Sequence, residues 1–193
     1  MINLILFGPP GAGKGTQSAK IIEKYSLMHI STGDLFRKHL KEGTPLGKLA
    51  QDYMSKGNLV PDQLVIDMVD DKIKSSDDIK GIIFDGFPRT TPQAEALDKL
   101  LASKAAPIKV LIELVVPEEE LKKRLAERAV KENRPDDAKP EVIANRINVY
   151  KAETVAVGQY YKDHKKYSSV IGAGAIDEIF QNICAQIDKS LLL

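Results

Sequence analysis

The chain has 193 residues, of which 43% are hydrophobic and 28% are charged, the composition of an ordinary globular protein that can build one compact core. Lys and Arg total 28 and Asp and Glu total 27, so the formal net charge of +1 gives no electrostatic basis for general binding to nucleic acid or to a membrane. The single cysteine, Cys184, excludes an internal disulfide and a multi-cysteine zinc site, and it fits a reducing, cytoplasmic compartment. No apolar run is long enough to cross a bilayer.

The first motif is a glycine-rich stretch at residues 8–17, Gly-Pro-Pro-Gly-Ala-Gly-Lys-Gly-Thr-Gln. It follows an apolar run at residues 2–7, which we expect to be a strand rather than a signal peptide, and it leads into an expected helix at 18–24. Glycines permit the backbone angles with which successive N–H groups surround a phosphate at the positive end of a helix. Lys14 would add a mobile positive charge for the β- and γ-phosphates. A glycine-rich turn without a ligand is the alternative, but the spacing and the flanking elements favour a phosphate-binding loop.

This loop departs from the usual pattern at one position. Such loops commonly carry Ser or Thr directly after the lysine, where the hydroxyl can bind Mg²⁺. Here Gly15 occupies that place and Thr16 follows one position later. We therefore expect Mg²⁺ to be held mainly by phosphates and water, with no direct protein ligand assigned.

The next part of the chain contains more helices than a simple crossover between parallel strands needs. A short apolar run at 27–30 ends at a Ser-Thr-Gly-Asp turn. After it, helical spacing and caps predict helices at 35–40, at 46–55 and after Asp62. Residues 31–60 are therefore expected to form an inserted subdomain.

Further apolar runs complete the pattern of a sheet protein. Strands are expected at 82–85, 110–116 and 170–172. Helices are expected at 92–103, 118–130 and 140–163 and at the C-terminus. Cys184 in the C-terminal helix should be a buried thiol. Five apolar strands separated by helices predict an α/β protein with a five-stranded parallel sheet in a three-layer α/β/α arrangement. Asp85 ends one strand, where ligands bind in open α/β sheets, so we expect it near Mg²⁺. A role as a turn or cap residue is the alternative for Asp85.

Arginines recur beside these motifs: Arg37, Arg89, Arg124, Arg128, Arg134 and Arg146. Each could be a solvated surface residue, but Arg89 follows the expected ligand-binding strand end. Guanidinium groups suit two negatively charged phosphate groups that must be brought together in line. Phosphoryl transfer depends mainly on positioning and charge neutralisation, so the three scattered histidines are expected to be structural or surface residues.

Five segments occur together: 8–17, 31–37 (Ser-Thr-Gly-Asp-Leu-Phe-Arg), 56–62 (Lys-Gly-Asn-Leu-Val-Pro-Asp), 85–93 (Asp-Gly-Phe-Pro-Arg-Thr-Thr-Pro-Gln) and 134–137 (Arg-Pro-Asp-Asp). In these segments and their order the chain resembles the adenylate kinase family, short-lid form, among the nucleoside monophosphate kinases of the P-loop proteins. The resemblance covers nearly the whole chain. It implies a P-loop NTPase fold and reversible, Mg²⁺-dependent phosphoryl transfer from ATP to AMP, giving two ADP, in adenine nucleotide homeostasis.

The resemblance also implies roles for individual residues. The ATP-binding set would be Gly11, Ala12, Gly13, Lys14, Gly15, Thr16, Arg124, Arg128 and Gly174. The AMP-binding set would be Thr32, Arg37, Asn58, Leu59, Val60, Gly86, Phe87, Pro88, Arg89, Gln93, Arg134 and Arg146. Catalysis would rest on Lys14, Arg89, Arg128, Arg134 and Arg146. Within the AMP set, Arg37 and Arg89 would bind the phosphate, and Gln93 would bind the adenine edge.

The family's domain organisation carries over in the same way. A core would comprise residues 1–30, 61–126 and 138–193, with an AMP-binding insertion at 31–60 and a short lid at 127–137. Asp136 and Asp137 would pair with arginines as the lid closes. The short lid lacks the cysteines of long-lid relatives, so no structural zinc is expected. A monomer is the default, with ATP, AMP and ADP as its partners.

Two alternatives stay open on the sequence. A UMP/CMP kinase shares the fold, but Thr32 and Gln93 favour adenine, because a carboxamide can pair with an adenine edge. A non-catalytic ATP-binding switch or adaptor belongs to a different class. Retention of Lys14 and of the arginines is evidence against such a binding module, which would need few of them.

Overall fold

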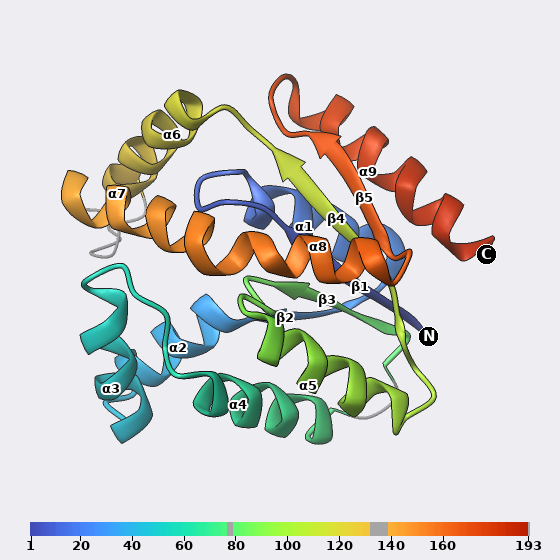
Figure 1. The fold of residues 1–193 in the computed structure, drawn as a ribbon, viewed down its shortest axis with the longest axis horizontal. Coiled ribbons are helices and arrows are strands. Elements are labelled where there is room, and N and C mark those ends of the chain that lie inside the picture. The colour runs from blue at the N-terminus through green and yellow to red at the C-terminus, as the bar shows by residue number, and fades with distance from the viewer. Residues whose placement is uncertain (77–78, 132–138, 193) are drawn as a thin grey trace.

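Five strands form a single parallel sheet in the order β2-β3-β1-β4-β5, in a computed structural model that describes residues 1–76, 79–131 and 139–192 (Figure 1). The strands are β1 (Ile2–Phe7), β2 (Met28–Ser31), β3 (Gly81–Asp85), β4 (Ile108–Val115) and β5 (Tyr167–Ile171). The helices are α1 (Lys14–Tyr25), α2 (Thr32–Lys41), α3 (Pro45–Met54), α4 (Asp62–Lys74), α5 (Thr91–Ala102), α6 (Glu118–Lys131), α7 (Pro140–Val149), α8 (Val155–Asp163) and α9 (Ile176–Leu191), with a π-helical segment η2 (Tyr150–Thr154).

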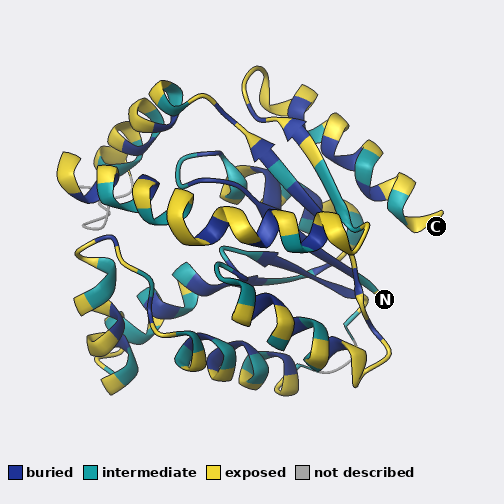
Figure 2. Ribbon diagram, viewed as in Figure 1, coloured by how far each residue is buried: buried dark blue, intermediate teal, exposed yellow. Residues whose placement is uncertain are grey.

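The two faces of the sheet have separate hydrophobic layers, because successive side chains of a strand point in opposite directions. On β1, Leu4 and Leu6 belong to a cluster with residues of α1 and α9. Ile5 and Phe7 belong to the other cluster, with residues of α4, α5 and α8. Figure 2 shows the strands mostly buried and the covering helices buried only along one side. The expected three-layer α/β/α fold is thereby confirmed.

The carboxyl ends of the central strands meet at one edge of the sheet. Asp85, the last residue of β3, is in register with Leu6 on β1 and with Ser31 on β2. In Figure 1 the arrowheads of β4 and β5 point toward the end of the molecule where α2–α3 and α6–α7 lie, away from both chain termini. This edge therefore receives the loops that carry most of the sequence motifs.

The helices of the insertion begin at side-chain caps. Ser31 Oγ accepts a hydrogen bond from the Asp34 N–H at 3.3 Å, and Thr44 Oγ1 accepts one from the Gly47 N–H at 3.1 Å. Helix α2 starts at Thr32, earlier than the expected start at residue 35, because Ser31 both ends β2 and caps the helix. The caps thus explain how the chain turns directly from strand into helix at this edge.

The expected single helix at 140–163 contains a π-helical segment between α7 and α8. The Val155 N–H donates to the Tyr150 carbonyl, the five-residue spacing of a π-helix. Tyr150 Oη donates to Glu113 Oε1 at 3.1 Å, and its ring lies 5.7 Å from that of Phe7. These partners are distant in the sequence, so helical periodicity alone does not indicate the π segment.

The C-terminal part of the fold is close to expectation. Strand β5 begins at Tyr167, earlier than expected, because this polar stretch pairs with β4 and Tyr167 Oη donates to Glu113 Oε2. Cys184 on α9 is buried, as expected. None of the described helices is both long and apolar enough to span a membrane.

Candidate active site

A glycine-rich turn joins β1 to α1, as the sequence predicts. Gly13, the last residue before α1, has a φ of 92°, in the left-handed region that a Cβ makes unfavourable. Within the described chain no side chain caps this helix terminus, and its first turn has no acidic residue. The positive end of α1 and its first N–H groups therefore suit a phosphate.

Lys14 lies at the base of this turn. Its Nζ donates to the carbonyl oxygens of Gly8 at 2.8 Å and Pro9 at 3.1 Å. Burial lowers the pKa of Lys14 to about 8, against the opposing effect of Asp85. The positive charges of three arginines lower this pKa further: Arg89, Arg146 and Arg128. The fold thus brings Lys14, Asp85 and three of the expected catalytic arginines within electrostatic reach of one another.

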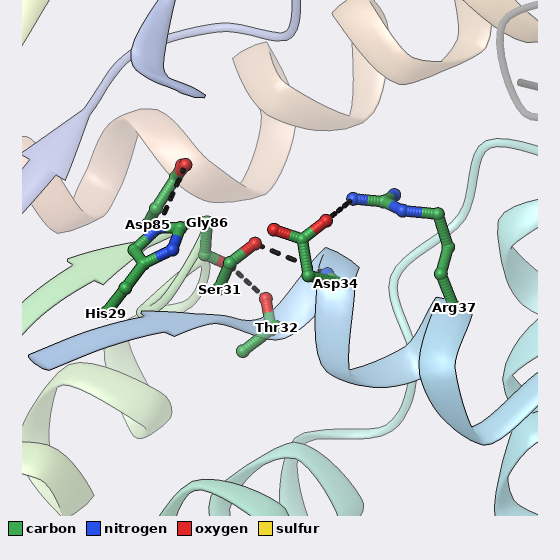
Figure 3. A network of polar contacts seen from close by, with 7 residues as sticks. All are labelled: His29, Ser31, Thr32, Asp34, Arg37, Asp85 and Gly86. Atoms are coloured by element: carbon green, nitrogen blue, oxygen red, sulfur yellow. Dashed lines mark hydrogen bonds and ion pairs between the residues drawn. The ribbon is translucent and has the colours of Figure 1, made fainter. Parts of the chain in front are cut away.

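The carbonyl oxygen of Gly86 holds two side chains of the expected AMP-binding set. Thr32 Oγ1 donates to it at 2.8 Å (Figure 3), and Arg89 Nε donates to it at 2.7 Å. Gly86 follows Asp85, whose carboxylate lies 3.8 Å from His29 Nε2 (Figure 3). His29 therefore lies at the edge of the site, although its sequence context did not indicate this.

Arg37 is paired with a carboxylate in this structure. Its Nη2 donates to Asp34 Oδ1, and both side chains project from α2 (Figure 3). Partial burial acts to raise the pKa of Asp34, but the hydrogen bond and charge of Arg37 outweigh it, so this pKa lies below its usual value. A phosphate bound at Arg37 would share the guanidinium group with Asp34 or displace it.

One cavity is lined by both the phosphate loop and the insertion. Of the expected site residues it is lined by Lys14, Thr32, Arg37, Asn58, Leu59, Val60, Gly86, Phe87, Pro88, Arg89, Gln93 and Arg146. Apart from Arg134, this is the whole expected AMP-binding set together with the lysine of the loop. Arg134, Asp136 and Asp137 lie outside the described residues.

Arg124 and Gly174 of the expected ATP-binding set are found on two elements beside the phosphate loop. Arg124 Nε donates to Glu120 Oε1 at 2.8 Å, and Arg124 Nη1 donates to the Gly172 carbonyl at 3.0 Å. A Cβ at Gly13 would lie 3.8 Å from Arg124 Nη1, so this guanidinium group lies against the loop. Gly174 follows in the same β5–α9 connection, with a φ of 121°. Helix α6, this connection and the phosphate loop therefore meet at one place.

Gln93 is buried in the wall of the cavity, with an exposed fraction of 1%. Its Oε1 accepts from the Arg89 N–H at 2.8 Å, and its Nε2 donates to Asp62 Oδ1 at 2.7 Å. In the sequence, Asp62 ends the motif at 56–62 and precedes a helix, and nothing there indicates Gln93 as its partner. Its contact with Gln93 depends on the packing of α4 beside α5.

Several lining residues were assigned no functional role from the sequence: Phe36, Met54, Gly57, Val65, Tyr150 and Thr154. Most of them fit a helical periodicity that core residues also show, so the pattern did not separate wall from core. Phe36 and Gly57 lie inside the motifs at 31–37 and 56–62, so their membership of these motifs could have indicated them. A mainly apolar wall with a few placed polar groups suits a nucleobase.

The carboxylates fit a metal ion that arrives with the nucleotide. Among the described residues, no group of three or more His, Cys, Asp or Glu side chains could enclose a metal ion. Asp85 supplies a partly buried carboxylate within electrostatic reach of Lys14. Mg²⁺ usually keeps several waters and binds through substrate phosphates with one or two carboxylates, which matches this arrangement.

Comparison with known proteins identifies the family. A family model described as adenylate kinase matches residues 6–166. The adenylate kinase of Bacteroides thetaiotaomicron is 48% identical over 98% of this chain and 100% of its own length. Those of Parabacteroides distasonis (49% identity; 95% and 96%) and Flavobacterium psychrophilum (47% identity; 98% and 100%) are similarly close. The chain therefore belongs to the adenylate kinase family and is a phosphotransferase of the nucleoside monophosphate kinase class.

Proposed function

We propose that this chain transfers the γ-phosphoryl group of Mg²⁺-bound ATP to the phosphate of AMP, reversibly, giving two ADP. The observation that carries the proposal is the single cavity that Lys14 of the phosphate loop shares with the AMP-binding set of the insertion and of the β3–α5 connection. Both phosphates of an in-line transfer could meet there. Residues that bind only one nucleotide would not need this shared position.

The phosphate loop and the arginines would act by positioning and by charge neutralisation. The N–H groups at the start of α1 would hold the ATP phosphates, and Lys14 would leave its carbonyl partners to follow the charge on the transferring group. Arg89, Arg128 and Arg146 would surround the same group, because their charges already act on Lys14. The bond from the γ-phosphorus to the ATP β–γ bridging oxygen breaks as the bond to an AMP phosphate oxygen forms.

The acceptor would lie between the insertion and the β3–α5 connection. Arg37 and Arg89 would bind its phosphate, and Thr32 and the backbone at 58–60 would contact the nucleoside. Gln93 would pair with the adenine edge, since an amide offers both a donor and an acceptor. These assignments follow the family resemblance and agree with the residues that line the cavity.

The phosphates of the nucleotide would be the main ligands of Mg²⁺. Adenylate kinases generally use Mg²⁺ with ATP, and here the ion would neutralise phosphate charge, with Asp85 acting on it directly or through water. No residue is proposed as a structural zinc ligand. Asp85 would also keep Lys14 charged, because its carboxylate raises the pKa of that side chain.

The proposed organisation comprises a core, an AMP-binding insertion at 31–60 and a short lid at 127–137. Arg134 would reach the transferring group when the lid closes, and Asp136 and Asp137 would pair with arginines. A lid that closes over both nucleotides suppresses transfer to water, the competing acceptor. We also propose a monomer in the cytoplasm, where a lone buried thiol such as Cys184 is ordinary.

A product assay with Mg²⁺-ATP and, separately, AMP, UMP and CMP tests the proposal. We expect rapid ADP formation with AMP, little with the pyrimidine nucleotides, and conversion of ADP alone into ATP and AMP. Lys14→Met should lower kcat by about 10²-fold or more, whereas Lys38→Met, at an exposed position on α2, should leave it unchanged. Fast turnover with UMP or CMP would overturn the assignment of Gln93. ATP binding with no transfer to any acceptor would indicate a binding module.

A further inference from the structure

The side-chain amide of Gln93 is held at both ends by groups of fixed hydrogen-bonding polarity. Its Oε1 accepts from the backbone N–H of Arg89 at 2.8 Å, and its Nε2 donates to Asp62 Oδ1 at 2.7 Å. Thr90 Oγ1 also donates to Asp62 Oδ1, at 3.0 Å. The carboxylate of Asp62, at the start of α4, thus accepts hydrogen bonds from two residues at the start of α5, Thr90 and Gln93, beside the wall of the cavity.

These partners allow only one orientation of the amide. A backbone N–H can only donate and an ionised carboxylate can only accept. Rotation of the amide by 180° would place its oxygen against the carboxylate and its N–H₂ against the Arg89 N–H. Gln93 is 1% exposed, so water could not readily replace the lost bonds.

The fixed orientation matters because purine edges differ in polarity. Adenine presents a donor at N6 beside an acceptor at N1, whereas hypoxanthine and guanine present an acceptor at O6 beside a donor at N1. After its two internal bonds, Gln93 retains one N–H and one lone pair, enough for one base edge. An amide that is free to rotate could pair with either kind of edge, but one that is held cannot.

We propose that Asp62 is a specificity-determining positioning residue: through its bond to Gln93 Nε2 it holds the amide in the orientation that pairs with a 6-aminopurine and rejects a 6-oxopurine. This inference rests on the proposed function, in which Gln93 reads the base of the acceptor nucleotide. Asp62 need not touch the base. It acts by opposing the rotated amide from the Nε2 end. With an asparagine at this position only the Arg89 N–H would still oppose the rotation, because the asparagine amide can itself turn to accept or to donate.

The test compares kcat/KM for AMP and for IMP, with Mg²⁺-ATP as donor, in the wild type and in Asp62→Asn. We expect the AMP preference to fall by about tenfold or more, through a loss with AMP and a gain with IMP. The KM for ATP should stay unchanged. Asp62→Ser, which keeps a residue suited to the start of a helix, should show the same loss of preference if Asp62→Asn folds poorly.

Asp67→Asn is the matched control, because Asp67 lies on the same helix and accepts from Gln63 rather than from Gln93. It should leave the AMP preference intact. A wild-type protein that transfers to AMP, loses its AMP preference in Gln93→Ala, but keeps it in both Asp62 variants would overturn the role of Asp62 alone. An unchanged preference in Gln93→Ala would instead overturn the base assignment within the proposed function, and this inference with it.

Discussion

At the scale of single residues, Lys14 occupies a position where its charge is costly without a ligand. Burial lowers its pKa to about 8 from the usual value of 10.5, and the charges of Arg89, Arg128 and Arg146 add to this shift, whereas Asp85 opposes it. Between these two pH values the folded protein binds fewer protons at Lys14 than the unfolded chain, so this residue's contribution to stability increases as pH rises. The negative charge of nucleotide phosphates would offset the positive charge around Lys14 and raise the pKa of this side chain again.

We therefore expect ATP binding at pH 8 to be coupled to uptake of about half a proton at Lys14. The side chain is about half protonated without ligand, and the phosphates should protonate it fully. ATP affinity should accordingly fall as pH rises above 8. Calorimetric titrations in two buffers of different ionisation enthalpy measure the proton number. Lys14→Met should abolish the uptake and Lys38→Met should preserve it; equal uptake in the wild type and Lys14→Met would contradict the assignment.

At the scale of elements, the π segment η2 forms part of the cavity wall. Tyr150 and Thr154, its first and last residues, both line the cavity. Burial and the nearby carboxylate of Glu113 raise the pKa of the Tyr150 hydroxyl, which keeps it a hydrogen-bond donor at ordinary pH. This bond ties the helical wall to the end of β4.

Tyr150→Phe should lower the free energy of unfolding by about 1–2 kcal/mol, because Glu113 loses one of its two tyrosine donors. It should also raise the KM for AMP, since the wall of the cavity is no longer held. Tyr160→Phe is the matched control: it removes a bond to Asp98, and Tyr160 is not among the lining residues. Thermal unfolding and steady-state kinetics separate the two effects. Equal KM changes in both variants would argue against a specific role for the π segment.

The contact between the insertion and α7 depends on a glycine. Gly57 has a φ of 77°, and a Cβ there would lie 2.9 Å from both the Val142 carbonyl oxygen and Arg146 Cγ. Nearby, Asn145 Nδ2 donates to the Lys56 carbonyl at 2.7 Å and to Asn58 Oδ1 at 2.9 Å. Close approach of the two backbones at this point places residues 57–60 opposite Arg146 in the cavity wall.

Gly57→Ala should destabilise the fold and raise the KM for AMP, whereas Gly43→Ala should only destabilise it. Gly43 has a similar φ of 69°, but a Cβ there would meet nothing within 4 Å. The shared backbone strain should cost about 1 kcal/mol in each variant. The steric clash should cost Gly57→Ala about 1–3 kcal/mol more. Chemical denaturation and AMP kinetics measure both quantities; matching results for the two variants would show that the close contact is unimportant.

At the scale of the whole molecule, the fold brings separate parts of the chain to one edge of the sheet. The phosphate loop follows β1, Thr32 follows β2, the Gly86–Arg89 segment follows β3, and Arg146 arrives from α7. Because strands β1, β2 and β3 are parallel neighbours, their carboxyl ends deliver these groups together. We propose that the short lid at 127–137 closes over the site at this edge and excludes water.

Arg134→Ala should lower kcat by about 10²-fold with a smaller change in KM, if Arg134 contacts the transferring phosphoryl group as proposed. It should also raise the ratio of ATP hydrolysis to phosphoryl transfer, because water would be less well excluded. Lys139→Ala, at an exposed position just beyond this segment, should change neither quantity. A kcat equal to that of the wild type in Arg134→Ala would show that this arginine does not contact the transferring group.

Features that depend on short-range geometry could be predicted from the sequence. Apolar runs and helical spacing predicted five strands with helices on both faces. The glycines before Lys14 predicted the phosphate loop, and the ordered motifs predicted the family. Such signals survive without a structure because backbone conformation, caps and amphipathic faces are set by residues a few positions apart. The residues of the AMP-binding set that the structure describes all line one cavity, although their roles remain predictions.

The contacts between residues that are distant in the sequence depend on the tertiary structure. In the folded chain Gln93 donates a hydrogen bond to Asp62, and Tyr150, the first residue of the π segment, donates one to Glu113. His29 lies beside Asp85. Each pair joins two elements of the fold, and neither member has a local pattern that names its partner. The first two contacts are hydrogen bonds, which form because buried polar atoms are satisfied by the groups that packing brings near them, a condition that only the folded chain defines.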